Sequence, residues 1–395
     1  MGKVFYIIAI SLLFIGHIRA QAWTELGGPN SLFANKTIFC LYSDATGNIY
    51  AAGNFTNAAG KKYVAKYDGK NWSELGGLNS LAANAYIACI CGDTSGNIYV
   101  GGQFTDSNGI SYVAKYDGKA WTSLGGVNRL GARSQTNPAY GIETTSLIVS
   151  ICSDIAGNIY AAGRFLNSSD KYYVAKYNGT AWGQLGSLAV DQQITKLCCD
   201  ASGNIYATGG FKNSAGKYYI ARYNGTNWSE LGGLNTLAAN NSVSDICIDA
   251  AGNVYAAGMF TNQFGKHYLA KFNGKGWSDL GCFNGSAAKS INSEGLVASG
   301  IGSICCDASG TVYATGGFIN PSVSDKDKPL SWASGQFYVA KYNGTAWVEL
   351  GGPIGLAANA EINRICRGPS GAVYAAGWFT NASKTYYVAK CVDHK

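Results

Sequence analysis

The side chains that could carry out chemistry are few and irregularly placed. The chain has only three histidines, which are too scattered to form a metal-binding cluster. It contains no G-x-S-x-G element, no P-loop and no dinucleotide-binding fingerprint. A pair of carboxylates could serve as acid and base in glycoside hydrolysis, and the candidates are Glu143, Glu294, Asp325, Asp327 and Glu361. Because charged loop residues mostly serve solvation, we expect no catalytic residue, no metal and no cofactor.

Cysteine is the other reactive side chain, with twelve copies. Six lie two residues before the start of a turn that is usually Asp-x-x-Gly: Cys91, Cys152, Cys198, Cys247, Cys305 and Cys366. Equivalent positions on stacked sheets are about 10 Å apart, which exceeds disulfide reach. We therefore interpret these six as small buried hydrophobic residues. The others could pair, with a connectivity that the sequence leaves open: Cys40, Cys89, Cys199, Cys282, Cys306 and Cys391.

These positions belong to a repeat that organises the whole chain. One nine-residue motif occurs seven times, as GNIYAAGNF (47–55), GNIYVGGQF (96–104), GNIYAAGRF (157–165), GNIYATGGF (203–211), GNVYAAGMF (252–260), GTVYATGGF (310–318) and GAVYAAGWF (371–379). A period near 50 residues is typical of a propeller or a solenoid.

Each repeat divides into four short strands, here called a to d. In the third repeat, strand a covers 150–153, an Asp-x-x-Gly-Asn turn follows at 154–158, and the motif itself forms strand b. Strand c covers 173–177, and an Asn-Gly hairpin leads to strand d, which carries a tryptophan. Strands b and c are apolar on both faces, as expected of strands sandwiched between layers.

The two ends of the chain predict how the repeats close. The chain begins with an isolated strand d at 22–27 and ends on a strand c at 387–390. The first strand can therefore complete the last sheet and remove its exposed edge, whereas a linear solenoid would need caps. We predict an all-β fold, a seven-bladed β-propeller of four-stranded antiparallel blades, as a single domain over 21–395.

The motif order NIYAAGNF…YVAKYDG…W-x-x-L resembles kelch and galactose-oxidase-like propeller repeats. It is more similar still to repeats of large secreted bacterial proteins, which read Asp-x-x-Gly-Asn-Val-Tyr followed by Trp-x-x-Leu-Gly. The kelch double glycine is present only at Gly102, Gly210 and Gly317, and the copper site of galactose oxidase cannot be mapped. Because such propellers serve as enzymes, adaptors and lectins, the resemblance implies a fold and not an activity.

The N-terminus indicates where the protein is located, and the net charge restricts its partners. Residues 1–20 read as a secretory signal peptide, with basic Lys3, an apolar stretch at 4–16 and a small-residue cleavage site. The alternative is an uncleaved anchor, although the apolar stretch is short for a membrane span. We expect a secreted or cell-surface monomer (periplasmic if the cell is Gram-negative) with no transmembrane segment after cleavage. A net charge of +7 without a Lys/Arg cluster argues against nucleic acid.

The repeats differ mainly in three insertions, at 126–147, 282–301 and 319–336. The first two join strand d to strand a and the third joins b to c. In an antiparallel blade both kinds of connection leave from the same face, here called the loop face, and the tight a–b and c–d turns lie on the turn face. Irregular loops often carry function, so we expect a protein or a glycan to bind the loop face. Neutral drift in loop length is the alternative interpretation.

The residue before the strand-b phenylalanine also varies and lies near the loop face. From this position and from the insertions we select six candidate binding residues: Gln103, Tyr140, Arg164, Met259, Trp332 and Trp378. Exposed aromatic side chains can anchor a protein partner or stack on a sugar ring. The leading hypothesis is a binding scaffold, and the alternatives are a lectin with repeated sites between blades and a hydrolase or lyase on the propeller face.

The basic residue of strand c recurs in every repeat, as in Lys66 and Lys176. We expect it to pair with the aspartate of the a–b turn while its aliphatic stem packs on tryptophan. The seventh repeat has Gly368 in place of that aspartate.

Overall fold

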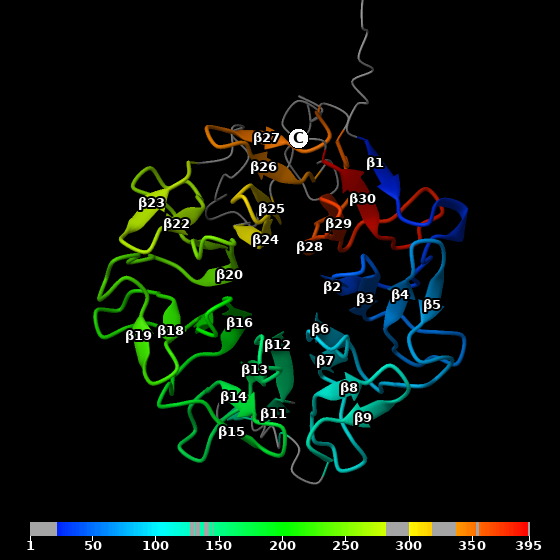
Figure 1. Cartoon of the computed structure of the whole chain (residues 1–395), viewed down its shortest axis with the longest axis horizontal. Coiled ribbons are helices and arrows are strands. Elements are labelled where there is room, and N and C mark those ends of the chain that lie inside the picture. The colour runs from blue at the N-terminus through cyan, green and yellow to red at the C-terminus, as the bar shows by residue number, and fades with distance from the viewer. Residues whose placement is uncertain are drawn as a thin grey trace, which may run out of the picture.

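A computed structural model describes residues 22–126, 130, 135–137, 142–144, 146–281, 300–317, 337–352 and 355–393. Its strands form seven four-stranded antiparallel sheets, arranged as blades around a common axis (Figure 1), which confirms the predicted fold class. A 3-10 helix (η1, Gly28–Asn30) and a two-stranded hairpin of β10 (Gln135–Asn137) and β11 (Ile142–Thr144) complete the described elements.

In blades I to VI the strands run from the axis outward in chain order. Blade I holds β2 (Ile38–Ser43), β3 (Ile49–Gly53), β4 (Ala65–Tyr67) and β5 (Trp72–Glu74). Blade II holds β6 (Ile87–Gly92), β7 (Ile98–Gly102), β8 (Ala114–Tyr116) and β9 (Trp121–Ser123). Blade III holds β12 (Leu147–Ser153), β13 (Ile159–Arg164), β14 (Ala175–Tyr177) and β15 (Trp182–Gln184). Blade IV holds β16 (Ile194–Cys199), β17 (Ile205–Gly209), β18 (Ala221–Tyr223) and β19 (Trp228–Glu230).

Blade V holds β20 (Val243–Ile248), β21 (Val254–Gly258), β22 (Ala270–Phe272) and β23 (Trp277–Asp279). Blade VI holds β24 (Ile301–Cys306), β25 (Val312–Gly316), β26 (Ala340–Tyr342) and β27 (Trp347–Glu349). Blade VII holds β28 (Arg364–Arg367), β29 (Ala372–Ala376), β30 (Ala389–Val392) and, as its outer strand, β1 (Trp23–Glu25). The strands are shorter than the repeated motif, and the phenylalanine that ends it lies beyond strand b.

The ring closes through its two ends, as predicted. β1 pairs antiparallel with β30, and the register places Trp23 opposite Cys391 and Glu25 opposite Ala389. The backbone N–H of Leu26 extends the pairing by donating to the Val388 carbonyl at 2.8 Å. The outer strand of the last blade therefore comes from the start of the chain.

The second strand of each blade explains why the motif is rich in alanine and glycine. In β3 every residue is buried, and Ala51 and Ala52 are fully excluded from solvent. A β-carbon on Gly53 would lie 2.3 Å from the Thr37 carbonyl oxygen, because the neighbouring strand crosses there with a register shift. The other six blades have the same close approach at the corresponding glycine, so only glycine fits.

The aspartate turn explains the rest of the motif. One carboxylate oxygen of Asp44 accepts the backbone N–H groups of Thr46 and Asn48, and the other accepts the Asn48 amide and the Tyr50 hydroxyl. Burial acts to raise the pKa of Asp44, but these hydrogen bonds outweigh it and hold the pKa below its ordinary value. The turn aspartate and the Asn and Tyr of the motif thus form one hydrogen-bonded unit that ties strand a to strand b.

The basic residue of strand c does not lie where we expected it. The Lys66 ammonium group lies 5.9 Å from the centroid of the Tyr50 ring, and Lys176 lies 5.7 Å from that of Tyr160. The tyrosine faces the lysine across the b–c pairing and its hydroxyl already serves the turn aspartate. In these blades the lysine therefore makes a cation–π contact with tyrosine, where we had expected it to pair with the turn aspartate over tryptophan. In blade VI, Lys341 instead pairs with the Asp393 carboxylate at 2.7 Å.

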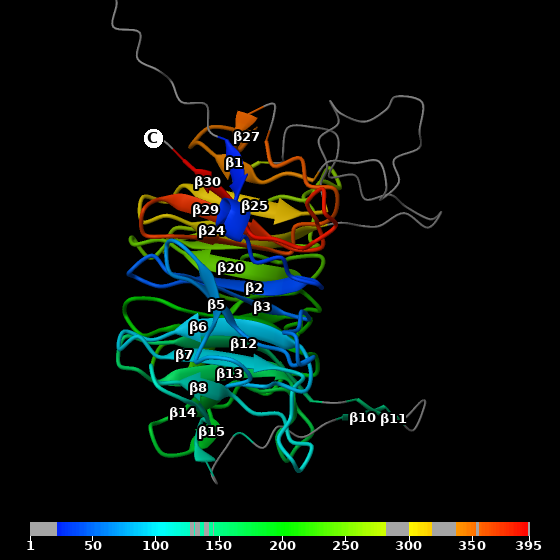
Figure 2. The same ribbon diagram turned by 90° about the vertical axis from the view of Figure 1, so that its right-hand side faces the viewer.

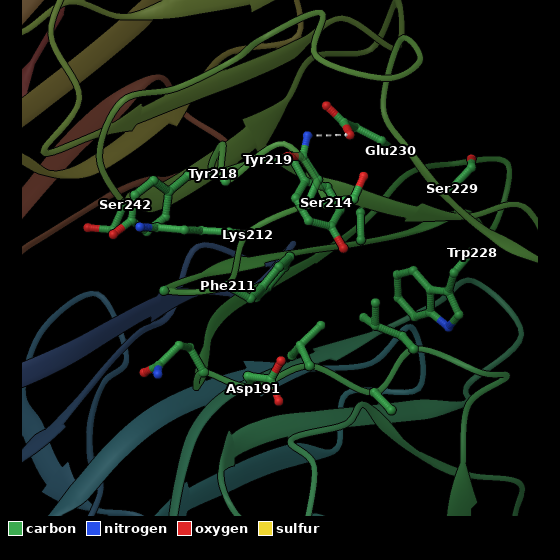
Figure 3. Close-up of a pocket in the computed structure, with 18 of the residues that line it drawn as sticks. Asp191, Phe211, Lys212, Ser214, Tyr218, Tyr219, Trp228, Ser229, Glu230 and Ser242 are labelled. Carbon is green, nitrogen blue, oxygen red and sulfur yellow. Dashed lines mark hydrogen bonds between the residues drawn. The ribbon is translucent and has the colours of Figure 1, made fainter.

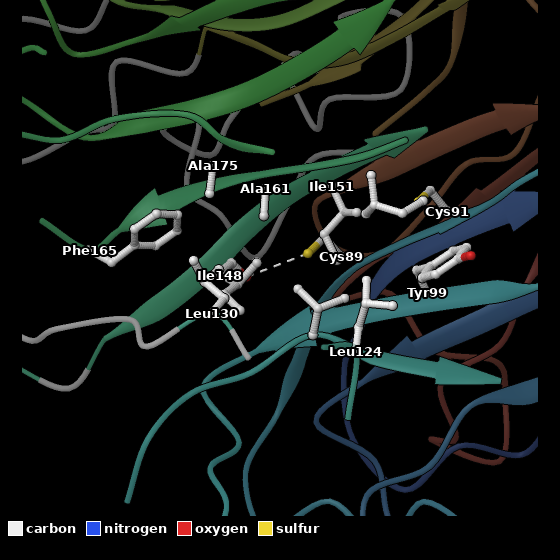
Figure 4. Packing of buried hydrophobic residues seen from close by; sticks show 12 residues of the cluster. Cys89, Cys91, Tyr99, Leu124, Leu130, Ile148, Ile151, Ala161, Phe165 and Ala175 are labelled. Atoms are coloured by element: carbon white, nitrogen blue, oxygen red, sulfur yellow. Dashed lines mark hydrogen bonds between the residues drawn. The ribbon is translucent and has the colours of Figure 1, made fainter. Parts of the chain in front are cut away.

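Tryptophan links each blade to the one before it. The indole N–H of every strand-d tryptophan donates to a leucine carbonyl of the preceding blade: Trp23 to Leu350, Trp72 to Leu26, Trp121 to Leu75, Trp182 to Leu124, Trp228 to Leu185, Trp277 to Leu231 and Trp347 to Leu280. Inside this outer ring, the apolar faces of adjacent blades interdigitate. Figure 4 shows one such cluster, in which Leu124 and Tyr99 of blade II pack with Ile148 and Ile151 of blade III.

Candidate functional site

The loop face is defined by pairing between its two kinds of connection. In blade I, Lys62 of the b–c segment bridges to Ala83 of the following d–a segment, and Tyr218 and Ala239 repeat this bridge in blade IV. The hairpin β10–β11, which lies within the insertion at 126–147, projects beyond the strands on one side of the disc (Figure 2). Most of the three insertions, including Tyr140 and Trp332, lies outside the described residues.

The other four candidate residues occupy one register position around the axis on the loop face. The backbone N–H of each of three donates to a carbonyl just before its own strand a: Gln103 to Tyr86 at 3.1 Å, Met259 to Ser242 at 2.9 Å and Trp378 to Glu361 at 2.9 Å. Arg164 ends β13 and pairs with Leu147 at the start of β12. The backbone is thus uniform, and the side chains are the variable part.

Trp378 forms an aromatic group with residues of two other blades. Its ring centroid lies 6.3 Å from that of Phe39 in blade I, and Phe39 lies 5.5 Å from Tyr86 at the start of blade II, both in edge-on contacts. Trp378 is 49% exposed. We call Phe39, Tyr86 and Trp378 the axial cluster. The sequence analysis selected Trp378 but missed Phe39 and Tyr86, which precede or open strand a and do not recur in the repeat.

The Arg164 and Met259 side chains make other contacts. The Arg164 guanidinium Nε donates to Gln193 Oε1 of blade IV at 2.7 Å. The sulfur of Met259 fills the space beside Gly300, where a β-carbon would approach it to 2.7 Å. Arg164 and Met259 therefore contact the following blade, and among the four candidates that the structure describes Trp378 is the large apolar residue with half of its surface in solvent.

A charged group links the inner strands of blades IV, V and VII. The Asp245 carboxylate is 1% exposed and lies 2.7 Å from Lys196 Nζ and 3.8 Å from Arg364 Nη1. It also accepts the backbone N–H groups of Ile246 and Ile304. Arg364 Nε donates to the Phe39 carbonyl at 3.3 Å, so this group contacts the axial cluster through the backbone of Phe39. Lys196, Asp245 and Arg364 occupy one register position in three blades.

A second feature of the loop face is a cleft of about 1050 Å³ at the outer part of blade IV. Asp191 comes from the d–a segment, Lys212 from the b–c segment, and Trp228 and Glu230 from strand d (Figure 3). A smaller cleft of about 510 Å³ lies at the equivalent place in blade I. The two share a lining of tryptophan, tyrosine, asparagine and glutamate: Trp228, Tyr219, Asn213 and Glu230 in blade IV, and Trp72, Tyr63, Asn57 and Glu74 in blade I.

The turn face is less uniform than the sequence indicated. A cleft of about 350 Å³ lies among the a–b turns of blades I to III, lined by Asp44, Asp93 and Asp154. Burial favours the neutral form of each carboxyl, but hydrogen bonds from turn groups outweigh it and lower all three pKa values. These carboxylates thus accept hydrogen bonds from groups of their own turns. Among the described residues no group of three or more His, Cys, Asp or Glu is placed to hold a metal ion.

Of the five carboxylates proposed as acid or base, one is described with its side chain. Glu361 precedes β28 on the loop face, and burial raises the pKa of its carboxyl. Glu143 lies on β11, for which only the backbone is described, and Glu294, Asp325 and Asp327 lie outside the described residues. The part of the chain that the structure describes therefore assembles no acid/base pair from these candidates.

No family model and no curated protein matches the chain. Among solved structures, it is similar to virginiamycin B lyase from Staphylococcus aureus, with 11% identity over 94% of this chain and 99% of the lyase and a TM-score of 0.55. The extracellular domain of the one-component system BT4673 from B. thetaiotaomicron matches at 14% identity over 94% of this chain, with a TM-score of 0.53. YCF48 bound to D1 peptide matches at 12% identity over 94% of this chain and 97% of YCF48, with a TM-score of 0.50.

The chain spans only 40% of the length of the BT4673 structure. At this level of identity the similarities establish the propeller fold and leave the ligand and the kelch-like character open. The neighbours include proteins that bind partners and one lyase. Among the described residues no helix is long and apolar enough to cross a membrane.

Proposed function

We propose that this protein is an exported binding scaffold that captures a protein or peptide partner on its loop face, centred on the axial cluster. The observation that supports the proposal is the half-exposed indole of Trp378, which makes an edge-on contact with the Phe39 ring. Large exposed aromatic side chains on a rigid frame are typical centres of protein interfaces, because they bury much area at little cost in side-chain entropy.

Two further considerations support this proposal. The neighbour YCF48 is a propeller of similar size whose structure contains a bound peptide, and the BT4673 neighbour is an extracellular domain. Within the proposal, residues 1–20 serve as the signal peptide, the repeats are kelch-like, and the insertions at 126–147, 282–301 and 319–336 extend the contact surface. Tyr140 and Trp332 are then additional contacts carried by these insertions.

A phage-displayed random peptide library tests the proposal. We expect peptides that bind the wild-type chain to lose about thirtyfold in affinity on Trp378→Ala, which corresponds to about 2 kcal/mol for a central aromatic residue. The matched control is Ile155→Ala, because Ile155 is 68% exposed on the turn face. Binding by Ile155→Ala should stay within about twofold of wild type. Equal binding by Trp378→Ala and wild type would contradict the proposal, as would failure to select any peptide.

A lectin activity is the second candidate, favoured by the equivalent clefts in blades I and IV. Each combines aromatic rings with amide and carboxylate groups, and the side-chain amide of Asn57 or Asn213 donates to its glutamate at 3.0 Å. Calorimetric titration with an oligosaccharide chosen from a glycan array should then give more than one site per chain. A stoichiometry of one, lost in Trp378→Ala, would instead assign the sugar to the axial cluster.

We also propose that the protein is not an enzyme. The lyase neighbour makes this worth testing directly, with a panel of glycosidase, esterase and lyase substrates. Turnover of any substrate that is lost in Glu361→Gln would overturn this part of the proposal, because Glu361 is the described carboxyl whose environment favours the neutral, acid form.

A further inference from the structure

The inner strands of adjacent blades converge so closely that thiols of neighbouring blades meet. The Sγ atoms of Cys152 at the end of β12 and Cys199 at the end of β16 lie 2.8 Å apart. Cys152 is one of the six equivalent cysteines that we interpreted as small buried hydrophobic residues, and the partner of Cys199 was left open, but the structure brings these two thiols together. A spacing of about 10 Å applies to sheets that are stacked face to face. The distance between adjacent blades becomes smaller toward the axis. Cα atoms of β12 and β16 approach within 8 Å.

The repeat makes this contact systematic. The residue two before each turn aspartate faces the residue one before the aspartate of the next blade. Tyr42 shows the same geometry, because its hydroxyl lies 2.5 Å from where a β-carbon on Gly92 would be. Cys198 and Ile248 likewise pack in one cluster. The same offset brings together Cys247 and Cys306, which pack against one cluster.

Cysteine meets cysteine at two of the seven interfaces in this register. The facing residues, in blade order from I to VII, are Tyr42 with Gly92, Cys91 with Ser153, Cys152 with Cys199, Cys198 with Ile248, Cys247 with Cys306, Cys305 with Arg367 and Cys366 with Ser43. Of the adjacent cysteines Cys198–Cys199 and Cys305–Cys306, only the second member faces a cysteine of the preceding blade.

We propose that Cys152–Cys199 and Cys247–Cys306 are disulfide sites that join blade III to IV and blade V to VI. All four residues are thiols in the structure and are partly accessible. Each bond closes a long loop, of 47 residues between Cys152 and Cys199, and long loops are where a cross-link constrains the unfolded chain most. The inference does not depend on which ligand the loop face binds.

The chemistry requires an external disulfide as oxidant. The Cys199 thiolate attacks a sulfur of the oxidant and forms a mixed disulfide, and the Cys152 thiolate then displaces the remaining thiol. Each pair gives up two protons and two electrons, and the oxidant is reduced to two thiols. Burial, together with the partner thiol, raises the pKa of Cys152 and Cys247. Oxidation of the closed ring should therefore be slow at neutral pH and faster at alkaline pH.

Peptide mapping of the full chain tests the proposal. Protein purified without reductant is incubated with glutathione disulfide at mildly alkaline pH, unfolded, alkylated with N-ethylmaleimide and digested without reduction. We expect two cross-linked peptides, Cys152 with Cys199 and Cys247 with Cys306, and alkylated Cys91 and Cys366. Complete alkylation of all four paired residues would overturn the proposal, and so would other connectivities, such as a vicinal Cys198–Cys199 bond.

A matched pair of variants separates the cross-link from simple packing. In the oxidised protein, Cys152→Ser should release the Cys199 thiol for alkylation, whereas Cys91→Ser, at the equivalent position facing Ser153, should leave both disulfides intact. Dithiothreitol should lower the melting temperature of wild type and Cys91→Ser by several degrees and that of Cys152→Ser by less. An equal change in melting temperature in wild type and both variants would overturn the proposal. Should Cys152→Ser fail to fold, the wild-type peptide map still decides.

Discussion

Removal of the Trp23 side chain is the sharpest test of ring closure. β1 is tied to blade VII without a covalent hairpin, by three residue pairs with β30 and by the indole of Trp23. That indole packs against the blade VI–VII cluster and donates to the Leu350 carbonyl at 2.8 Å. Trp23→Ala therefore removes both the packing and the hydrogen bond that hold the strand in place.

The expected magnitude follows from burial. Replacement of a buried tryptophan by alanine costs about 3–5 kcal/mol, and the net loss of one hydrogen bond, about 1 kcal/mol, is part of that range. Because Trp23 is half-buried, we expect the lower end, a loss of about 3 kcal/mol in the free energy that holds β1 on β30. This corresponds to about a hundredfold increase in the population of the opened strand.

Hydrogen exchange by mass spectrometry measures this opening directly. The control is Trp121→Ala, whose indole makes the same bond, to the Leu75 carbonyl at 2.9 Å, in an interface remote from closure. Both variants should lower the urea midpoint, but only Trp23→Ala should accelerate exchange selectively in β1 and β30, by about a hundredfold. Unchanged exchange in these strands, or a change of less than about 1 kcal/mol, would refute closure by β1.

Three further predictions concern other parts of the ring. The turn carboxylates have pKa values below their ordinary ones, so their stabilisation is complete above about pH 4. It is lost as the pH falls through the folded pKa values, and Asp93→Asn should reduce the dependence of the urea midpoint on acid pH. Asp245→Ala leaves the partly exposed Lys196 without its carboxylate and should cost about 3 kcal/mol in urea unfolding. Ser303→Ala, at the same register position, removes one 3.4 Å hydrogen bond and should cost about 1 kcal/mol. Trp378→Ala should leave the melting temperature within a few degrees of wild type, because half of that side chain is already in solvent.

The repeat made most of the architecture predictable. The number of blades, the four strands in each and the closure by the first strand follow from counting tryptophans and motif copies, because each copy imposes the same local pairing. The partner of the strand-c lysines was predicted wrongly, since it depends on which side chain lies across the b–c register. Phe39, Tyr86 and the Asp245 group were not predicted, because they lie outside the repeated pattern and meet only when blades I, II and VII, or IV, V and VII, are arranged around one axis.

The order of residues alone determined the turns, the small residues of strand b and the identity of the last outer strand, because each depends on interactions within one repeat or on a simple count of strands. Distances between blades were decided only by the three-dimensional arrangement. The sequence grouped Cys152 with equivalent cysteines that a uniform sheet spacing keeps apart and left the partner of Cys199 open, whereas the wedge shape of the blades brings these two sulfurs to 2.8 Å. Convergence toward the axis is a property of the closed ring, and no single repeat contains it.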